Sequence, residues 1–288
     1  MNKNIINVRK DGLDKFYTNI DYAKQCISEL NLSKYDLIIE PSAGCGNFFY
    51  QINHPNKIGL DILPEKNHDI NNTTDNIICM DFFNYTPNIN DKNNKILVVG
   101  NPPFGKSCST AIKFFNHAAK WADTIAFIIP RTFRKISIQN KLDKNFHLIS
   151  DKDTPTNQCC FTPKMMVKCC FQIWENGKEP RIIINLPTKH PDWVFLSHGP
   201  LDTNNQPTPP KNADFVLRAY GGKIGQIIKT NLDSLRPKSW HWIKSKIDID
   251  ILISRFEKLD YSNSNNTARQ NSMGRGELVN LYSNKFAF

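Results

Sequence analysis

The most constraining feature of the sequence is the segment Lys95–Gly100, which is apolar after its first residue and runs directly into Asn101-Pro102-Pro103-Phe104. An apolar run of this length, closed by Gly and Pro, indicates a buried parallel strand that ends in a loop. The prolines disfavour helix and lack backbone donors, so the loop offers mainly acceptors, the Asn101 side-chain oxygen and the Pro102 carbonyl. With the flat ring of Phe104 beside them, these acceptors suit a planar group that carries an NH2. A proline turn that only caps a core strand would show the same pattern.

The composition is that of a globular protein. A chain of 288 residues, 40% hydrophobic and 22% charged, is long enough for one large domain or for one domain with an extension. Residues 1–15 show no apolar leader and no run has transmembrane length, so we expect a protein that is neither secreted nor in a membrane. The eight cysteines are then expected to be reduced, and because none has CxxC spacing we predict no metal site.

The net charge of +10 is unevenly distributed along the chain. Residues 1–100 hold 10 Lys and Arg against 12 Asp and Glu, whereas residues 101–150 hold 8 against 2. Residues 151–210 balance at 6 against 6, and residues 211–288 hold 13 against 7. Such segments favour a polyanionic partner, although an ordinary solvated basic surface would give the same counts.

A glycine turn follows an earlier apolar segment. Residues 36–40 read as a short buried strand that ends in the acceptor Glu40 and continues into Pro41-Ser42-Ala43-Gly44-Cys45-Gly46. Two glycines at i and i+2 allow a tight turn that brings backbone N–H groups close to a ligand at the end of the strand. Taken alone, this pair is a weak signal because it is not the full GxGxxG pattern.

Two further strands also end in carboxylates. Residues 57–61 end in Asp61, about 20 residues after the glycine turn, where a carboxylate can accept hydrogen bonds from ribose hydroxyls. Residues 76–80 are followed by Asp81 and Phe82, an acceptor beside an aromatic ring, which suits an adenine with its amino group. Each acid alone would be an ordinary loop carboxylate, but three acids at successive strand ends favour a nucleotide-like ligand.

The remaining elements up to Trp174 alternate between strand and helix. Apolar spacing predicts helices at 18–30, at 109–122 and from Arg131, and strands at 124–129, 146–149 and 167–174, with a hairpin between the last two strands. Thr18 is the expected N-cap of the first helix, with Asp21 completing a capping box. This alternation predicts an α/β protein with a doubly wound, Rossmann-like sheet and an antiparallel last strand, over a domain of residues 1–178.

Residues 179–288 are predicted to form a small α+β extension that serves as a possible substrate-recognition region. The pattern indicates short strands at 182–186, 193–196 and 215–218, a helix over 240–259, a mobile polar loop over 262–276 and a last helix from Glu277.

The segment from Glu40 to Phe48 resembles the cofactor loop of class I S-adenosylmethionine-dependent methyltransferases. Asn101-Pro102-Pro103-Phe104 resembles the catalytic motif of the adenine-N6 branch, and Phe16-Tyr17-Thr18 is similar to the motif that closes over the methionine part of the cofactor. The resemblance covers residues 15–175 and includes small DNA adenine methyltransferases of viruses and phages, which implies a cytoplasmic or host-cell intracellular location. It implies that S-adenosylmethionine is held by Tyr17, Thr18, Glu40, Pro41, Ser42, Gly44, Gly46, Asp61, Asp81, Phe82 and Asn101.

The implied reaction is methyl transfer to the exocyclic N6 of adenine in nucleic acid, with DNA preferred over RNA. The catalytic residues would be Asn101, Pro102, Pro103 and Phe104. Acceptors hold the amino group, and the base is flipped out of a duplex and stacked on the Phe104 ring. Candidate phosphate contacts, unless they are plain exposed helix surface, are Lys106, Arg131, Arg134 and Lys135.

Other activities fit the same motifs. The C-terminal part is short for a recognition domain of this class, so a separate specificity subunit is possible. Phe104 stands where the motif more commonly has Tyr, and Phe at this position also occurs in ribosomal RNA guanine-N2 enzymes. Methylation of an amino group in ribosomal RNA, at adenine N6 or guanine N2, is therefore an alternative activity. A protein glutamine N5-methyltransferase would use the same acceptors on a side-chain amide, and a non-catalytic cofactor-binding subunit ranks last.

Overall fold

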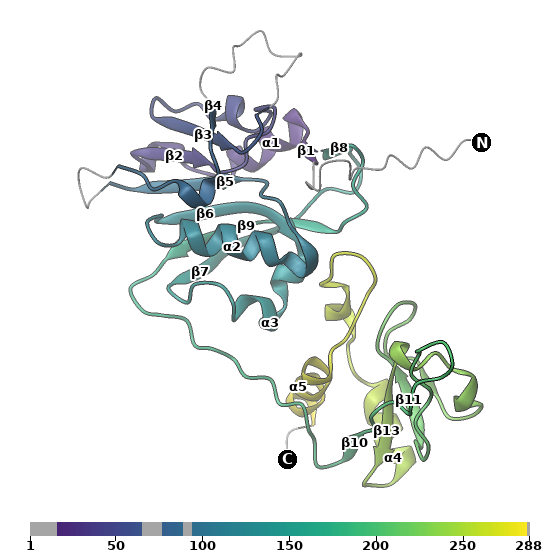
Figure 1. Cartoon of the computed structure of the whole chain (residues 1–288). Helices are drawn as coiled ribbons and strands as arrows, with labels where there is room; N and C mark the ends of the chain where they lie inside the picture. Colours follow the sequence, from purple (N-terminus) through teal and green to yellow (C-terminus); the bar gives the residue numbers. More distant parts are fainter. Residues whose placement is uncertain (1–15, 65–76, 89–93, 287–288) are drawn as a thin grey trace, which may run out of the picture. The chain divides into compact units, whose positions relative to one another are not determined.

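The computed structural model describes residues 16–64, 77–88 and 94–286 (Figure 1). The chain divides into two compact units, unit 1 at Met1–Ile183 and unit 2 at Ile184–Phe288. The sequence placed this division at residues 178 and 179. Among the described residues, no helix has the length and apolar character needed to span a bilayer.

Unit 1 is built on a seven-stranded sheet in the order β4-β3-β2-β5-β6-β9-β7 (Figure 1). Its strands are β2 (Leu37–Glu40), β3 (Lys57–Asp61), β4 (Ile77–Cys79), β5 (Ile96–Gly100), β6 (Thr124–Pro130), β7 (Phe146–Asp153) and β9 (Cys169–Asn176). Strands β2 to β6 pair in parallel, and β9 lies antiparallel between β6 and β7. The predicted doubly wound α/β sheet is confirmed, and its topological switch point lies between β2 and β5.

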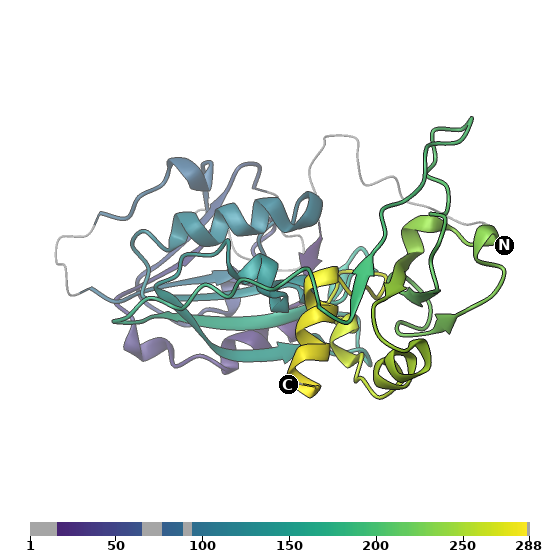
Figure 2. The same ribbon diagram turned by 90° about the horizontal axis from the view of Figure 1, so that it is seen from below.

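Helices α1 (Ile20–Ser28) and α2 (Ser109–Ala118) cover opposite faces of this sheet (Figure 2). Alternate residues of a strand point to opposite faces, so Val98 packs in the cluster that contains α2 residues and Val99 in the cluster that contains α1 residues. All residues of β5 are buried. A strand covered on both faces has no polar positions, which explains the continuous apolar run in the sequence.

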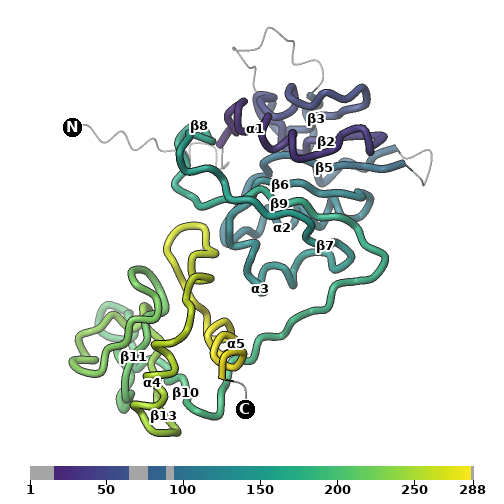
Figure 3. The backbone as a smooth tube through the Cα atoms, turned by 180° about the vertical axis from the view of Figure 1, so that it is seen from behind, coloured from purple at the N-terminus to yellow at the C-terminus, as the bar shows by residue number. Residues whose placement is uncertain are grey.

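A short ladder joins the start of the described chain to the segment between β7 and β9. Strand β1 (Tyr17–Thr18) pairs antiparallel with β8 (Phe161–Thr162), and the segment that carries β8 lies beside α1 (Figure 3). The expected capping box is wrong: Thr18 is extended in the ladder, and Asn19 is the N-cap of α1 without a side-chain cap bond. The β7–β9 pairing is confirmed, but its connection is a long segment containing β8 rather than a tight hairpin turn.

Unit 2 contains a four-stranded antiparallel sheet and two α-helices. The sheet order is β10 (Trp193–Phe195), β13 (Trp240–Ser245), β11 (Phe215–Arg218) and β12 (Ile227–Ile228), and the helices are α4 (Ile249–Glu257) and α5 (Arg275–Lys285). Both helices contribute to one buried cluster with the sheet, including Phe256 and Tyr282. The predicted α+β extension, its strands near 193 and 215 and its last helix are confirmed.

Two predicted elements of unit 2 are wrong in part. Residues 240–259 are not one helix, because Trp240–Ser245 pairs on both sides as β13. Helix α4 begins only after Asp248, whose side chain accepts a hydrogen bond from the backbone N–H of Ile251 at 3.0 Å. Residues 182–186 form no strand, and Ile182 is 86% exposed. Backbone pairing with β10 and β11, which helical spacing does not encode, decided the first case.

The polar segment 262–276 is packed rather than loose. It buries Ser264, Thr267 and Met273 and begins with a short 3-10 helix at Ser262–Asn265. Burial lowers the pKa of His241 on β13 to about 4, so its ring is neutral at physiological pH and can donate to the Met273 carbonyl at 2.8 Å.

Candidate active site

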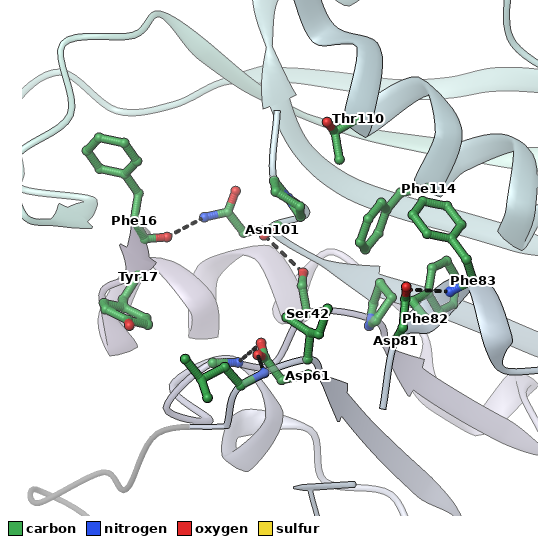
Figure 4. Close-up of a pocket in the computed structure, with 15 residues that line it drawn as sticks. Phe16, Tyr17, Ser42, Asp61, Asp81, Phe82, Phe83, Asn101, Thr110 and Phe114 are labelled. Atoms are coloured by element: carbon green, nitrogen blue, oxygen red, sulfur yellow. Dashed lines mark hydrogen bonds between the residues drawn. The ribbon is translucent and has the colours of Figure 1, made fainter. Parts of the chain in front are cut away.

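A cavity of about 280 Å³ lies at the carboxyl ends of the parallel strands, beside the switch point between β2 and β5 (Figure 4). The predicted residues that line it are Tyr17, Pro41, Ser42, Gly44, Asp61, Asp81, Phe82, Asn101 and Pro103. These residues come from five separate segments of the chain, one on the β1 ladder and four at or after the ends of parallel strands. Parallel strands present their carboxyl ends at one edge of the sheet, so the segments that follow these strands lie close together.

The glycine turn is held in a conformation that requires glycine. Gly44 has φ of +55° and Gly46 has φ of +83°. A Cβ atom on Gly44 would lie 2.9 Å from Cε1 of Tyr17, so the ring packs directly on the turn. Asp61 accepts hydrogen bonds from Gly44 N–H at 2.7 Å and from Leu63 N–H at 2.8 Å. The carboxylate therefore braces the turn and still presents acceptor sites to the cavity that it lines.

Asp81 is similarly anchored while it faces the cavity. Its Oδ1 accepts from Phe83 N–H at 3.0 Å. The adjoining Phe82, predicted to contact a bound ring, is 2% exposed and stacks on Phe114 with ring centroids 5.1 Å apart. Phe83 is 39% exposed and meets Phe114 edge-on, so Phe83 is the more accessible ring beside Asp81.

The side chain of Asn101 has a defined orientation. Its Nδ2 donates to the backbone carbonyl of Phe16 at 3.1 Å, and Ser42 Oγ donates to the backbone carbonyl of Asn101 at 3.2 Å (Figure 4). A carbonyl can only accept, so the amide must point its NH2 toward Phe16 and its oxygen away from it. The amide oxygen is therefore available as an acceptor. Pro103 lines the cavity, whereas Phe104 is half-buried against the α1-side core and lines neither described pocket.

Glu40 is buried without a complete set of partners. It is 2% exposed, and its Oε2 has no hydrogen-bond partner among the described residues. The nearby Lys57 ammonium donates instead to the carbonyls of Phe49 and Ile52, at 3.2 and 2.8 Å. Burial, and to a smaller extent the Asp61 carboxylate, raises the pKa of Glu40 well above its ordinary value.

A small second cavity of about 30 Å³ adjoins Glu40. Its lining includes Tyr17, Ser42 and Asn101, which also line the main cavity, together with Thr18. The Thr18 hydroxyl is buried and has no partner among the residues that the structure describes. Thr18 and Glu40 both line this small cavity, and two buried oxygens that lack a partner among the described residues favour a ligand that carries hydrogen-bond donors, above all a cationic one.

Two of the four predicted phosphate contacts are engaged in ion pairs. Arg134 binds Asp151 through Nε and Nη2, at 2.9 and 2.6 Å, and Arg131 lies 2.8 Å from Asp153. A phosphate would compete with these aspartates on β7. Lys106 is exposed after Gly105. The phosphate contacts of Lys106 and Lys135 stay a prediction.

Several residues of the cavity were missed by sequence reasoning. They are Ile62, Leu63, Phe83, Thr110 and Phe114; Phe16, which also lines the cavity, belongs to the predicted motif with Tyr17 and Thr18. Phe83 could have been found, because it directly follows the predicted pair Asp81 and Phe82. In the described ranges no group of three or more His, Cys, Asp or Glu side chains is arranged to hold a metal ion.

The sequence matches no protein-family model and no curated protein. Solved structures with similarity include the 23S rRNA methyltransferase ErmE, at 14% identity over 58% of this chain and 72% of that chain, with a TM-score of 0.41. The modification subunit assigned to a type I restriction enzyme of Vibrio vulnificus has 14% identity over 78% and 60%, with a TM-score of 0.41. An rRNA methylase from Streptococcus thermophilus has 14% identity over 56% and 98%, with a TM-score of 0.34. The fold assignment rests on the sheet order of this chain, not on these matches.

Proposed function

We propose that the protein is an S-adenosylmethionine-dependent methyltransferase that acts on the exocyclic N6 of adenine in DNA. The observation that carries this proposal is the fixed amide of Asn101, whose oxygen is an acceptor at the end of β5 and at the edge of the cavity. An acceptor that is held in place next to two prolines is suited to accept a hydrogen bond from the amino group of a substrate.

The cavity residues fit the proposed cofactor. The unpartnered oxygen of buried Glu40 suits a cationic amino group, because an ammonium would satisfy both its hydrogen bond and its charge. Asp61 and Asp81 keep acceptor capacity for ribose hydroxyls and an adenine amino group, and Phe83 offers an exposed ring beside Asp81. S-adenosylmethionine, when bound, supplies the sulfonium methyl group.

The chain contributes positioning and electrostatics rather than a strong base. The lone pair of an adenine amino nitrogen is delocalised into the ring, so the nitrogen is a poor nucleophile. Asn101 Oδ1 and the Pro102 carbonyl accept its two N–H groups and orient the lone pair outward. The same acceptors stabilise the positive charge that the nitrogen gains, and the extra proton then leaves to water. A base inside a duplex is out of reach and must be flipped out.

The test is nucleoside analysis after reaction. The protein is incubated with methyl-labelled S-adenosylmethionine and unmodified DNA or RNA, and the products are digested to nucleosides. We expect labelled N6-methyldeoxyadenosine. Label in N6-methyladenosine or N2-methylguanosine would transfer the assignment to RNA, label in protein glutamine would identify a protein methyltransferase, and no labelled product would refute the proposal.

The role of Asn101 has its own variant. Asn101→Ala removes the acceptor and is expected to abolish methyl transfer while cofactor binding, followed by thermal shift, is largely kept. Asn84→Ala is the matched control, because Asn84 is exposed nearby and does not line the cavity. Equal activity of Asn101→Ala and the control would refute the assigned role.

A further inference from the structure

Three segments of unit 2 meet around the carboxyl end of β11 and together carry positive charge only. They are residues 218–226, 235–240 and 261–274, which we call the basic patch. Backbone hydrogen bonds join them: Tyr220 N–H to the Ser239 carbonyl at 3.2 Å, and Gly221 N–H to the Asn271 carbonyl at 2.9 Å. The five cationic residues of the basic patch are Arg218, Lys223, Arg236, Lys238 and Arg269, and these segments contain no Asp or Glu.

The cations of the basic patch have no carboxylate partner within its three segments. Two other lysines of unit 2 are paired with carboxylates, Lys229 with Asp250 at 3.0 Å and Lys244 with Asp214 at 2.5 Å. Within the described residues, the exposed Lys223 has no such partner. Unpaired cations that are not neutralised locally attract a polyanion.

The centre of the basic patch combines a guanidinium with open backbone. Arg218 lies over the ring of Trp240, with its Cζ 4.7 Å from the ring centroid. Gly221 and Gly222 have φ of +66° and +49°, and Gly222, which is exposed and has no side chain, leaves its backbone open. A Cβ atom on Gly222 would lie 3.5 Å from Nη2 of Arg218, so the guanidinium sits directly beside this turn.

An exposed aromatic ring adjoins these cations. Tyr220 is 48% exposed, although tyrosine rings of this unit such as Tyr282 are buried. Next to it the Gln270 side-chain oxygen lies 3.6 Å from the position of a Cβ on Gly221. A ring among unpaired cations and amides is the combination that binds single-stranded nucleic acid, where bases stack on aromatics and phosphates meet Lys and Arg.

We infer that the basic patch binds a single-stranded segment of the DNA substrate, with a base stacked on Tyr220 and phosphates on Arg218 and Lys223. Single-stranded DNA is favoured over duplex because an exposed ring gains stacking only from a base that is already unstacked. This inference rests on the proposed function for the identity of the nucleic acid, but the binding itself requires neither cofactor nor methyl transfer.

The experiment measures fluorescence anisotropy of a labelled single-stranded DNA oligonucleotide with the full-length protein in the absence of cofactor. Tyr220→Ala is expected to weaken binding about tenfold, and Tyr220→Phe to restore it, because phenylalanine keeps the stacking face. Lys223→Ala should reduce the slope of log K against log salt by about 1. Lys229→Ala is the matched control: it removes one lysine charge of the same unit that is already paired with Asp250, and binding should stay close to wild type.

The outcomes separate this inference from the proposed function. Unchanged binding in both Tyr220→Ala and Lys223→Ala would overturn the inference, as would tighter binding of duplex DNA or of RNA than of single-stranded DNA. If single-stranded DNA binds through these residues but no nucleoside is methylated, the proposed function fails and the inference stands. If DNA is methylated although both variants bind as the wild type does, the inference fails and the proposed function stands.

Discussion

Replacing Glu40 by glutamine tests the electrostatics of the candidate site. The substitution keeps the shape of the side chain but removes its charge at every pH. Because Glu40 is 2% exposed and one carboxylate oxygen has no partner among the described residues, its ionised form is poorly solvated in the folded protein without ligand. We therefore expect Glu40→Gln to change how stability depends on pH.

The sign follows from the raised pKa of Glu40. A carboxyl group whose pKa is raised on folding contributes fully to stability below its unfolded pKa, about 4.3, and this contribution is lost as pH rises through the folded value. A buried unsatisfied polar group costs about 1–3 kcal/mol, and more when it is charged. Each kcal/mol moves the melting temperature of a domain of this size by about 2–4 °C. As the pH rises from 5 to 8, the melting temperature of Glu40→Gln should therefore rise by a few degrees relative to that of the wild type.

The assay is calorimetric unfolding of the wild type and Glu40→Gln over this pH range. Any cost in stability that the introduced amide carries independently of pH cancels, because the assay follows only how the difference in stability between variant and wild type changes with pH. Glu179→Gln, which alters an exposed carboxyl of unit 1, is the control and should show no such trend. A difference between wild type and Glu40→Gln that does not change with pH would refute the reasoning.

The same variant tests the proposed ligand. If Glu40 holds a cationic amino group, ionisation of the carboxyl accompanies binding. Cofactor binding to the wild type should release a proton below the raised pKa, and Glu40→Gln should abolish this release. Titration calorimetry in two buffers of different ionisation enthalpy measures the number of protons. Equal proton release by the two proteins would show that another group titrates.

Two further substitutions probe the wall of the cavity. Gly44→Ala would bring a Cβ to 2.9 Å from Tyr17 Cε1 at a φ of +55°, so we expect weaker cofactor binding and a loss of stability of about 1–2 kcal/mol from the backbone alone; calorimetric binding and stability equal to wild type would contradict this. Phe83→Ala removes a ring that is 39% exposed, so cofactor affinity should fall in an equilibrium binding assay while the melting temperature changes little. A large drop in melting temperature with unchanged affinity would instead assign Phe83 to the core.

The sequence predicted the sheet of unit 1 because strand period and burial are local properties. The segment around β5 is buried on both faces, and no polar position interrupts its pattern. Gly44, Asp61 and Asn101 were expected at one edge of the sheet for a related reason: they stand at or shortly after strand ends, and parallel strands end at one edge. Asp61, Gly44 and Asn101 therefore share one cavity, as their spacing implied.

Prediction was poorer in unit 2 because its strands depend on distant partners. Residues 240–245 have apolar spacing compatible with a helix, yet pairing with β10 and β11 makes them a strand. The basic patch likewise joins segments that are far apart in sequence, and nothing near Gly221 indicates that its N–H will bind the carbonyl of residue 271.

What the sequence determined by itself is which chemical groups stand at the ends of the parallel strands. What only the tertiary structure decided is how those groups are engaged. The Asn101 amide is oriented by the carbonyl of Phe16, which is 85 residues away in sequence. Arg134 forms an ion pair with Asp151 on β7. A hydrogen bond depends on distance and angle in space, and residues distant along the chain meet these conditions only once the sheet has formed.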